Sequence, residues 1–238
     1  MLYRRFSCWR RIVTFNLPRR WRKSGATDVP PVLPFTSRME FIGQRQKGKI
    51  PRREVLKLSN SLFVIERARP EEVAALLDYL KIVGGETENL SFGAEGVSLD
   101  LEAEQNHLRM QSESTDNVQY LAKVKDEIIG TASLNRKHKR MSHRGVFGIS
   151  LKKAWWGCGA ASALMEAILA FAKENDFEQL NLEVRSDNAR AIRLYEKYGF
   201  RKLCTFPQFF KINGEYIDFD LMNLELNTTD DRIGENAR

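Results

Sequence analysis

The chain has 238 residues, of which 42% are hydrophobic, enough to build one sizeable core with an extension. No stretch approaches the roughly 18 consecutive apolar residues of a spanning helix, so no membrane span is expected. Cys8, Cys158 and Cys204 are far apart and form no CxxC pair, which argues against a disulfide framework and a zinc site and favours a reducing, cytoplasmic location. Three histidines without an HExxH motif give metal-dependent or triad hydrolysis little support, and we expect no metal.

The positive charge is concentrated in the first quarter of the chain. Residues 1–60 contain 15 Lys and Arg against 3 Asp and Glu, a net charge of +12, whereas residues 61–238 contain 23 against 28, a net charge of −5. We therefore expect a basic, poorly ordered N-terminal extension over 1–60, a folded domain over 61–227 and a short polar tail over 228–238.

Residues 1–38 allow three interpretations. They are arginine-rich and end in a proline-rich stretch that cannot continue a helix. They could be a dispensable extension translated upstream of a start at Met39, an organelle-targeting segment, or an arm that binds nucleic acid or an anionic membrane. The sequence does not decide among them.

The hydrophobic pattern then alternates between strand and helix periods. A glycine-rich and glutamate-rich stretch over 84–96 reads as a loop, and turn signals fall at 125–127 and at Asn213-Gly214. The expected strands are 62–65, 118–124, 128–134, 146–151, 180–184, 204–212 and 216–226, and the expected helices are 70–80, 101–110, 160–174 and 188–198. This order predicts a mixed α/β sheet.

The most compact run of small residues, Gly157-Cys158-Gly159-Ala160-Ala161, follows a predicted strand and opens a predicted helix. Unpaired N–H groups at a helix N-terminus attract phosphate, and side chains larger than alanine would block its approach. No Lys-Ser/Thr follows, so the run is no Walker loop, and it is too short for a GxGxxG dinucleotide fingerprint. Tight packing between strand and helix is the competing interpretation.

A second motif lies about thirty residues on, in the segment 188–200, which reads NARAIRLYEKYGF. The order strand, GxGxA, helix, strand, NxxAIxLYExxGF resembles the GNAT superfamily of acetyl-coenzyme A-dependent N-acetyltransferases over about residues 62–226. The resemblance implies a twisted, mostly antiparallel sheet of about seven strands flanked by about four helices, with central parallel strands that splay apart. The fold class expected is therefore α/β, of the mixed α+β kind.

The resemblance also implies a site for acetyl-CoA as co-substrate. The loop from Trp156 to Ala161 would bind the pyrophosphate through backbone N–H groups, although the family pattern usually begins with Arg or Gln where this chain has Trp156. Asn188 resembles an asparagine that helps to hold the cofactor, and the strand before the loop would pair with the pantetheine arm. The implied cofactor-binding residues are Ile149, Ser150, Leu151, Trp156, Gly157, Cys158, Gly159, Ala160, Ala161 and Asn188.

The implied chemistry is acetylation of a primary amine on a small molecule or a protein. A phenol with a pKa of about 10 can protonate a thiolate, whose thiol has a pKa of about 8.5, only when it is held at the sulfur. Tyr195 resembles the family tyrosine near the thioester sulfur and is the candidate acid; a packing role on the sheet is the alternative. Glu183 is the candidate base, against the alternatives of a solvated strand glutamate and of proton transfer by water. Cys158 reads as a small filler rather than a nucleophile.

The acceptor is expected to bind near the 84–97 loop and the last hairpin, where Asp218 and Asp220 either face the amine or point into solvent. We expect catalysis to need no nucleic acid. The sequence is compatible with a homodimer. Two other functions remain: a non-catalytic acyl-CoA sensor, and a protein that acts through its basic N-terminal arm.

Overall fold

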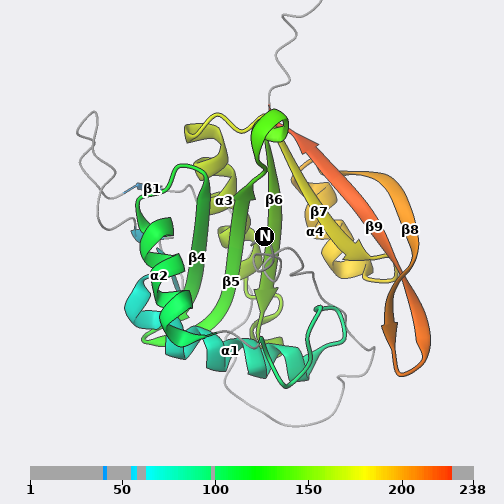
Figure 1. Cartoon of the computed structure of the whole chain (residues 1–238), viewed down its shortest axis with the longest axis horizontal. Coiled ribbons are helices and arrows are strands. Elements are labelled where there is room, and N and C mark those ends of the chain that lie inside the picture. Colours follow the sequence, from blue (N-terminus) through cyan, green and yellow to red (C-terminus); the bar gives the residue numbers. More distant parts are fainter. Residues whose placement is uncertain (1–39, 42–54, 58–62, 98–99, 227–238) are drawn as a thin grey trace, which may run out of the picture.

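The computed structural model describes residues 40–41, 55–57, 63–97 and 100–226 (Figure 1). Most of the predicted extension over 1–60 and the whole predicted tail over 228–238 lie outside these residues. The described parts of 1–60 are two short strands, β1 (Glu40–Phe41) and β2 (Val55–Lys57), which pair with each other. Because β2 also pairs with β3, residues before 61 contribute to the sheet.

One sheet organises the described part of the chain, in the order β1-β2-β3-β4-β5-β6-β7-β9-β8. Neighbouring strands are antiparallel except β6 and β7. Beyond the two short strands, seven strands form the sheet, as the sequence predicted: β3 (Val64–Arg67), β4 (Asn117–Val124), β5 (Glu127–Arg136), β6 (Arg144–Leu151), β7 (Gln179–Arg185), β8 (Arg201–Ile212) and β9 (Glu215–Glu225).

Four α-helices cover the two faces of this sheet, which confirms the predicted α/β architecture. Their apolar stripes pack into two cores: α3 and α4 lie behind the sheet in Figure 1 and share the larger core, while α1 and α2 share the smaller one with the other face. The α-helices and the described 3-10 turns are α1 (Val73–Glu86), α2 (Leu101–Ser112), α3 (Ala160–Glu174), α4 (Ala189–Lys197), η2 (Pro70–Glu72), η3 (Lys139–Met141) and η4 (Lys153–Trp155).

Helix α1 runs further than the sequence predicted. Gly84 and Gly85, expected to begin a loop, belong to its last turn, and the loop starts after Glu86. A Cβ on Gly84 would lie 2.0 Å from the carbonyl oxygen of Gly93. Gly84 is therefore required by the close return of the loop onto the helix rather than by a turn.

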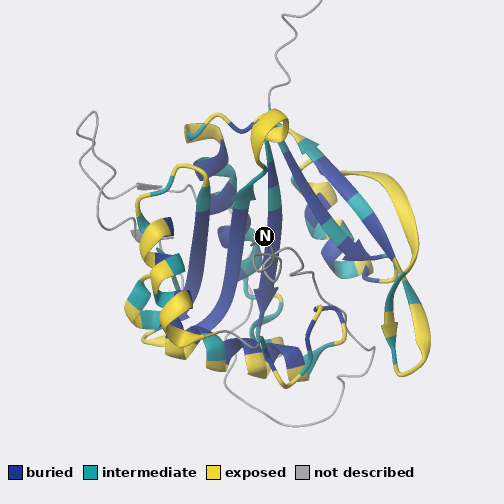
Figure 2. Ribbon diagram, in the orientation of Figure 1, coloured by how far each residue is buried: buried dark blue, intermediate teal, exposed yellow. Residues whose placement is uncertain are grey.

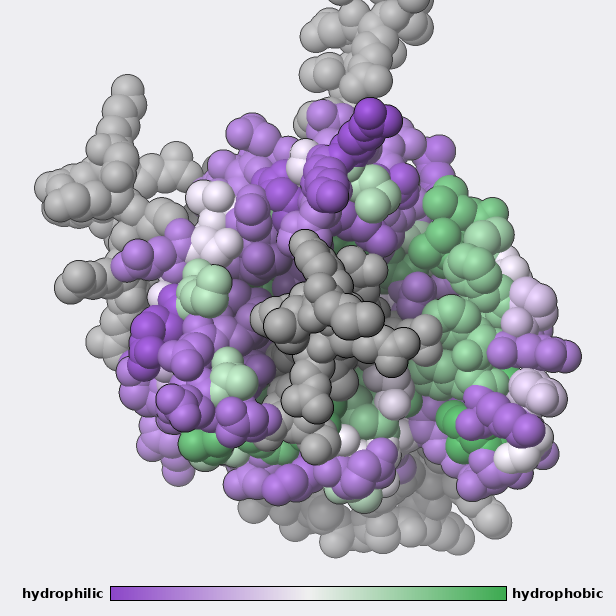
Figure 3. Space-filling model, viewed as in Figure 1, coloured by the Kyte–Doolittle hydropathy of each residue, from purple (hydrophilic) through white to green (hydrophobic). Residues whose placement is uncertain are grey.

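The β8–β9 hairpin extends the sheet at its edge. Its turn was correctly predicted from Asn213-Gly214, whose φ angles of 51° and 88° are those of a two-residue type I′ turn. The hairpin is exposed over much of its length, in contrast to the buried central strands (Figure 2). Apolar residues gather over β8 and β9 on the face shown in Figure 3. The exposed large hydrophobic residues of β8 and β9 are Leu203, Phe206 and Tyr216.

The two parallel strands at the centre of the sheet pair only at their beginning. Strand β6 faces β7 through three residue pairs, from Arg144↔Gln179 to Val146↔Asn181. Within the described residues no other strand lies beside β6 on that side beyond Val146, so the edge of Phe147–Leu151 faces the widening gap. The predicted splay is thus confirmed, and it opens toward the loop that follows β6.

No helix among the described residues is long and apolar enough to cross a membrane.

Candidate functional site

The loop between β6 and α3 is shaped by its two glycines. Gly157 and Gly159 have φ angles of 87° and 91°, a region that side chains adopt only with strain. Gly159 is the N-cap of α3, and no side chain caps the helix by a hydrogen bond. The start of α3 therefore presents backbone N–H groups and the positive end of the helix dipole to the space in front of it.

That space is a cavity of about 250 Å³ between the end of β6, the loop, the first turn of α3 and one face of α4. Its lining is mainly apolar or small, apart from Ser162, Arg190 and Tyr195. The lining residues are Ile149, Leu151, Trp156, Gly157, Gly159, Ala161, Ser162, Arg190, Ala191, Leu194 and Tyr195. Seven of these were predicted from the sequence. Helix α4 contributes its face at the spacing i, i+1, i+4, i+5, so the four positions lie on one side of the helix.

Four predicted cofactor-binding residues lie outside the cavity wall: Ser150, Cys158, Ala160 and Asn188. The Ser150 hydroxyl faces α1 and shares a 2.8 Å hydrogen bond with the buried Tyr79 hydroxyl, so only the Ser150 backbone is left for a ligand. The Cys158 thiol donates a hydrogen bond to the Trp155 carbonyl at 2.9 Å, and burial raises its pKa. A nucleophilic thiol needs the opposite shift, so the filler interpretation stands. Ala160 is fully buried as the first residue of α3.

Asn188 is the N-cap of α4 and is completely buried. Its side-chain oxygen accepts a hydrogen bond from the Ala191 N–H at 3.1 Å. The side-chain nitrogen has no hydrogen-bond partner within the described part of the chain. A buried donor without an acceptor costs about 1–3 kcal/mol, which favours an acceptor supplied by a ligand. Asn188 thus caps α4 through its side-chain oxygen, a role that the sequence analysis did not predict. Its side-chain nitrogen remains as a hydrogen-bond donor without an acceptor among the described residues.

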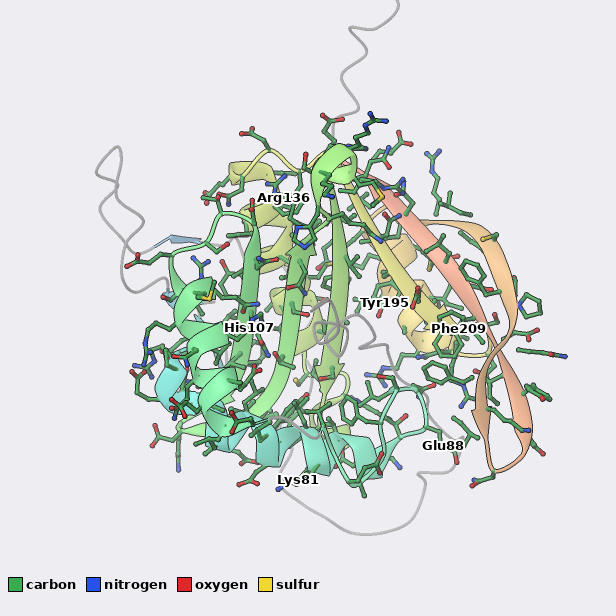
Figure 4. The ribbon with its side chains drawn as sticks, viewed as in Figure 1. Lys81, Glu88, His107, Arg136, Tyr195 and Phe209 are labelled. Carbon is green, nitrogen blue, oxygen red and sulfur yellow. The ribbon has the colours of Figure 1, made fainter. Side chains whose placement is uncertain are left out.

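Tyr195 lies on α4 and lines the cavity, and Figure 4 labels it between β6 and β7. Its ring is fully buried and packs edge-on against Phe147 at 6.1 Å and against Phe200 at 5.9 Å, measured between ring centroids. The packing interpretation of Tyr195 is therefore correct for the ring. It does not exclude a role for the hydroxyl, because the residue also lines the cavity.

Glu183 is not in the cavity. It alternates along β7 with Leu182 and Val184, whose side chains are buried in the larger core, so Glu183 lies on the opposite face of the sheet. That face is the one covered by α1 and by the 84–97 loop, since Arg185 on the same strand donates a hydrogen bond to the Glu88 carbonyl at 3.4 Å.

Of the two hairpin carboxylates, Asp220 differs from the expectation of a solvent-facing group and Asp218 does not. Asp220 is only 4% exposed and accepts hydrogen bonds from Ser186 at 2.6 Å and Thr205 at 2.9 Å, with Lys202 at 2.8 Å. Asp218 is exposed, as expected, and accepts from the Gln208 N–H at 2.8 Å. Asp220 is fully engaged in the hairpin, which leaves it poorly suited to bind an amine.

The site has the features that a phosphate-bearing ligand requires: a glycine-shaped loop at a helix N-terminus, a nearby cation and a buried spare donor. A pantetheine-like arm would fit the unpaired edge of β6. No group of three or more His, Cys, Asp or Glu in the described ranges could hold a metal ion. Fold and site together define an α/β protein in which one cavity joins a glycine loop at a helix N-terminus to an open strand edge.

Comparison with known proteins agrees with this class. The model of the Acetyltransferase (GNAT) family matches residues 88–200. The L-amino acid N-acetyltransferase AaaT of Escherichia coli K12 is 33% identical over 102 residues, which cover 42% of this chain and 63% of AaaT. The match thus spans less than two thirds of that relative.

Two solved structures share the fold. The GNAT-family acetyltransferase of Streptococcus pneumoniae superposes with a TM-score of 0.66 at 29% identity, covering 68% of this chain and 99% of that one. The protein yncA of Salmonella typhimurium, solved with its cofactor acetyl-CoA, has a TM-score of 0.62 at 17% identity, covering 71% and 97%. These comparisons indicate a GNAT-family acetyltransferase fold, with the family model matched over residues 88–200.

Proposed function

We propose that this protein is an N-acetyltransferase that transfers an acetyl group from acetyl-CoA to a primary amine of a small molecule or a protein. The observation that carries the proposal is the cavity, which joins the glycine loop at the start of α3 to Tyr195 at the parting of β6 and β7. The name of the relative AaaT supports an amino-group acceptor.

Acetyl-CoA would supply an activated acetyl thioester. In the proposal, N–H groups of the loop and of the first turn of α3 hold the pyrophosphate, and the Asn188 side-chain nitrogen donates to the arm. The free edge of Ile149–Leu151 orients that arm along β6. Tyr195 holds a proton at Oη and gives it to the departing sulfur, because it lines the same cavity as the end of β6, along which the arm and its thioester would lie.

The amine would approach from the opposite face of the sheet, between the 84–97 loop and the β8–β9 hairpin. Glu183 lies on that face and stays our candidate for removing a proton from the amine, either directly or through water. The acceptor needs to arrive neutral to attack, so a base on its own side of the sheet would serve the reaction, whereas a base inside the cavity would compete with the coenzyme for space.

The decisive experiment is a panel of amines, including free amino acids and peptides, assayed with acetyl-CoA while free thiol is followed. Release of thiol that depends on one amine, together with an acetylated product by mass spectrometry, supports the proposal. Tight binding of acetyl-CoA without turnover on any amine would favour the sensor function instead.

We also propose that the protein is located in the cytoplasm. A homodimer is compatible with the proposal, and the exposed apolar side chains of β8 and β9 offer a surface for it. Sedimentation at several protein concentrations would distinguish a monomer from a dimer.

A further inference from the structure

Arg190, on α4, is the cation closest to the glycine loop in the cavity wall. Its guanidinium carbon lies 5.5 Å from the centroid of the Trp156 ring. Its Nη2 atom would be 3.7 Å from a Cβ placed on Gly157. These contacts come from two consecutive loop residues, so the guanidinium is held over the loop rather than extended into solvent.

The charge of Arg190 has no carboxylate to balance it within the described residues. Two buried cations there have acidic partners: Arg185 pairs with Asp187 at 2.7 Å, and Lys123 pairs with Glu66 at 3.3 Å. For Arg190 no ion pair is found in the described ranges, although the side chain is half-buried. Burial lowers its pKa, and the neighbouring Arg193 lowers it further.

A half-buried, uncompensated guanidinium is unfavourable unless an anion shares its site. The N-terminus of α3 adds its own positive potential to the same cavity, because Gly159 and Arg190 both line it. Two sources of positive potential thus converge on one space beside a loop too small to block a phosphate. A guanidinium also offers paired donors that match two phosphate oxygens.

We infer that Arg190 binds the pyrophosphate of the coenzyme and makes the site selective for pyrophosphate-bearing donors over the pantetheine arm alone. This inference rests on the proposed function for the identity of the ligand. It concerns binding, so it can be measured without turnover.

The test compares Arg190→Gln with Arg193→Gln. Both remove one positive charge from α4, but Arg193 is exposed and does not line the cavity. Calorimetry would give the Kd of each variant for coenzyme A, for dephospho-coenzyme A, which keeps the pyrophosphate, and for pantetheine, which has no phosphate. We expect Arg190→Gln to weaken both pyrophosphate ligands by about 10- to 100-fold and to leave pantetheine unchanged.

Arg193→Gln should change none of the three by more than about twofold, since an exposed charge is largely screened. Arg190→Lys keeps the charge but loses the paired donors, so an intermediate loss is expected. The melting temperature of each unliganded variant checks the fold, and Arg190→Lys keeps the inference testable if Arg190→Gln melts early.

Three results for Arg190→Gln would overturn the inference. Binding of both pyrophosphate ligands could be unchanged, or pantetheine could lose as much affinity as they do, which would indicate that Arg190 acts by packing against Trp156. A loss of affinity for coenzyme A alone would indicate that Arg190 binds the 3′-phosphate. The proposed function fails separately if wild-type protein binds coenzyme A with the predicted dependence on Arg190 yet acetylates no amine. If the wild-type protein binds no coenzyme A, both the inference on Arg190 and the proposed function are wrong.

Discussion

The Tyr198 hydroxyl donates a hydrogen bond to the Glu166 carboxylate at 2.9 Å and so ties α4 to α3. A second contact, at 3.3 Å, reaches the Ser162 carbonyl. Burial, reinforced by the charge of Glu166, raises the pKa of Tyr198 to about 12. The two tyrosines of the LYEKY segment therefore have different surroundings: Tyr195 lines the cavity, whereas Tyr198 joins two helices outside it.

Because of this difference, Tyr198→Phe is a matched control for Tyr195→Phe, the variant that tests the proposed catalytic acid. Tyr195→Phe keeps the ring packing against Phe147 and removes only the hydroxyl. We expect turnover to fall by about 100- to 10,000-fold with unchanged affinity for acetyl-CoA. Tyr198→Phe should keep turnover but lose about 1–2 kcal/mol of unfolding free energy, because it breaks a hydrogen bond to a carboxylate. Steady-state kinetics and urea denaturation give both values.

A loss of turnover below about threefold in Tyr195→Phe would assign protonation of the sulfur to water or to another group. Catalytic acids usually contribute far more than that.

The loop and its flanking elements could be predicted because their signals are local. Gly157 and Gly159 sit between a strand pattern and a helix pattern, and their positive φ angles are the conformations that glycine favours. The Asn213-Gly214 turn is local for the same reason. Asn188 could be placed at a helix start, since asparagine is a preferred N-cap.

Contacts between distant segments could not be predicted in this way. The hydrogen bond between Tyr79 and Ser150 joins residues 71 positions apart, and no local pattern marks it. Arg190 reads as an ordinary charged residue on a helix surface. A helical projection from Tyr195 back through Leu194 and Ala191 would have placed Arg190 on the same face, and that signal was available. The position of Asp220 depends on how β8 pairs with β9, including register shifts that alternation alone does not reveal.

The glycine loop provides a second test of cofactor binding. Gly159→Glu and Gly214→Glu place the same side chain at φ angles of 91° and 88°, each at a strain of about 1–2 kcal/mol. Only Gly159 lines the cavity, so only Gly159→Glu should abolish the rise in melting temperature that acetyl-CoA produces. Gly214→Glu should melt earlier yet keep the full ligand-dependent rise. Equal ligand shifts in both variants would refute the loop assignment.

The N-terminal segment can be tested by truncation. Because residues 1–38 differ sharply in charge from the remainder, we propose that they are dispensable for folding and for catalysis. A chain that begins at Met39 keeps both short strands, β1 and β2, and should match the full chain in melting temperature and in turnover. Lost activity with unchanged melting would favour a functional arm, and loss of both would mean that the segment supports the fold.

Asp220 should make stability depend on pH in the acid range. Its burial alone would raise the pKa of the carboxyl, but the hydrogen bonds from Lys202, Ser186 and Thr205 outweigh burial and hold the pKa below its usual range. A lowered folded-state pKa stabilises the protein above the unfolded-state value of about 3.9, and this contribution disappears as the pH falls through the folded-state pKa.

We therefore expect Asp220→Asn to lower the unfolding free energy by about 1–3 kcal/mol at pH 7, because a buried hydrogen-bonded charge is lost. The gap to wild type should start to close as the pH falls below the unfolded-state value of about 3.9, and it should narrow further as the pH falls through the lowered folded-state pKa of Asp220. Asp218→Asn, on the same strand but exposed, should change stability by less than about 1 kcal/mol. Urea denaturation of the three proteins from pH 7 to pH 3 measures these values. A gap between Asp220→Asn and wild type that stays constant over this range would show that the Asp220 charge does not stabilise the hairpin.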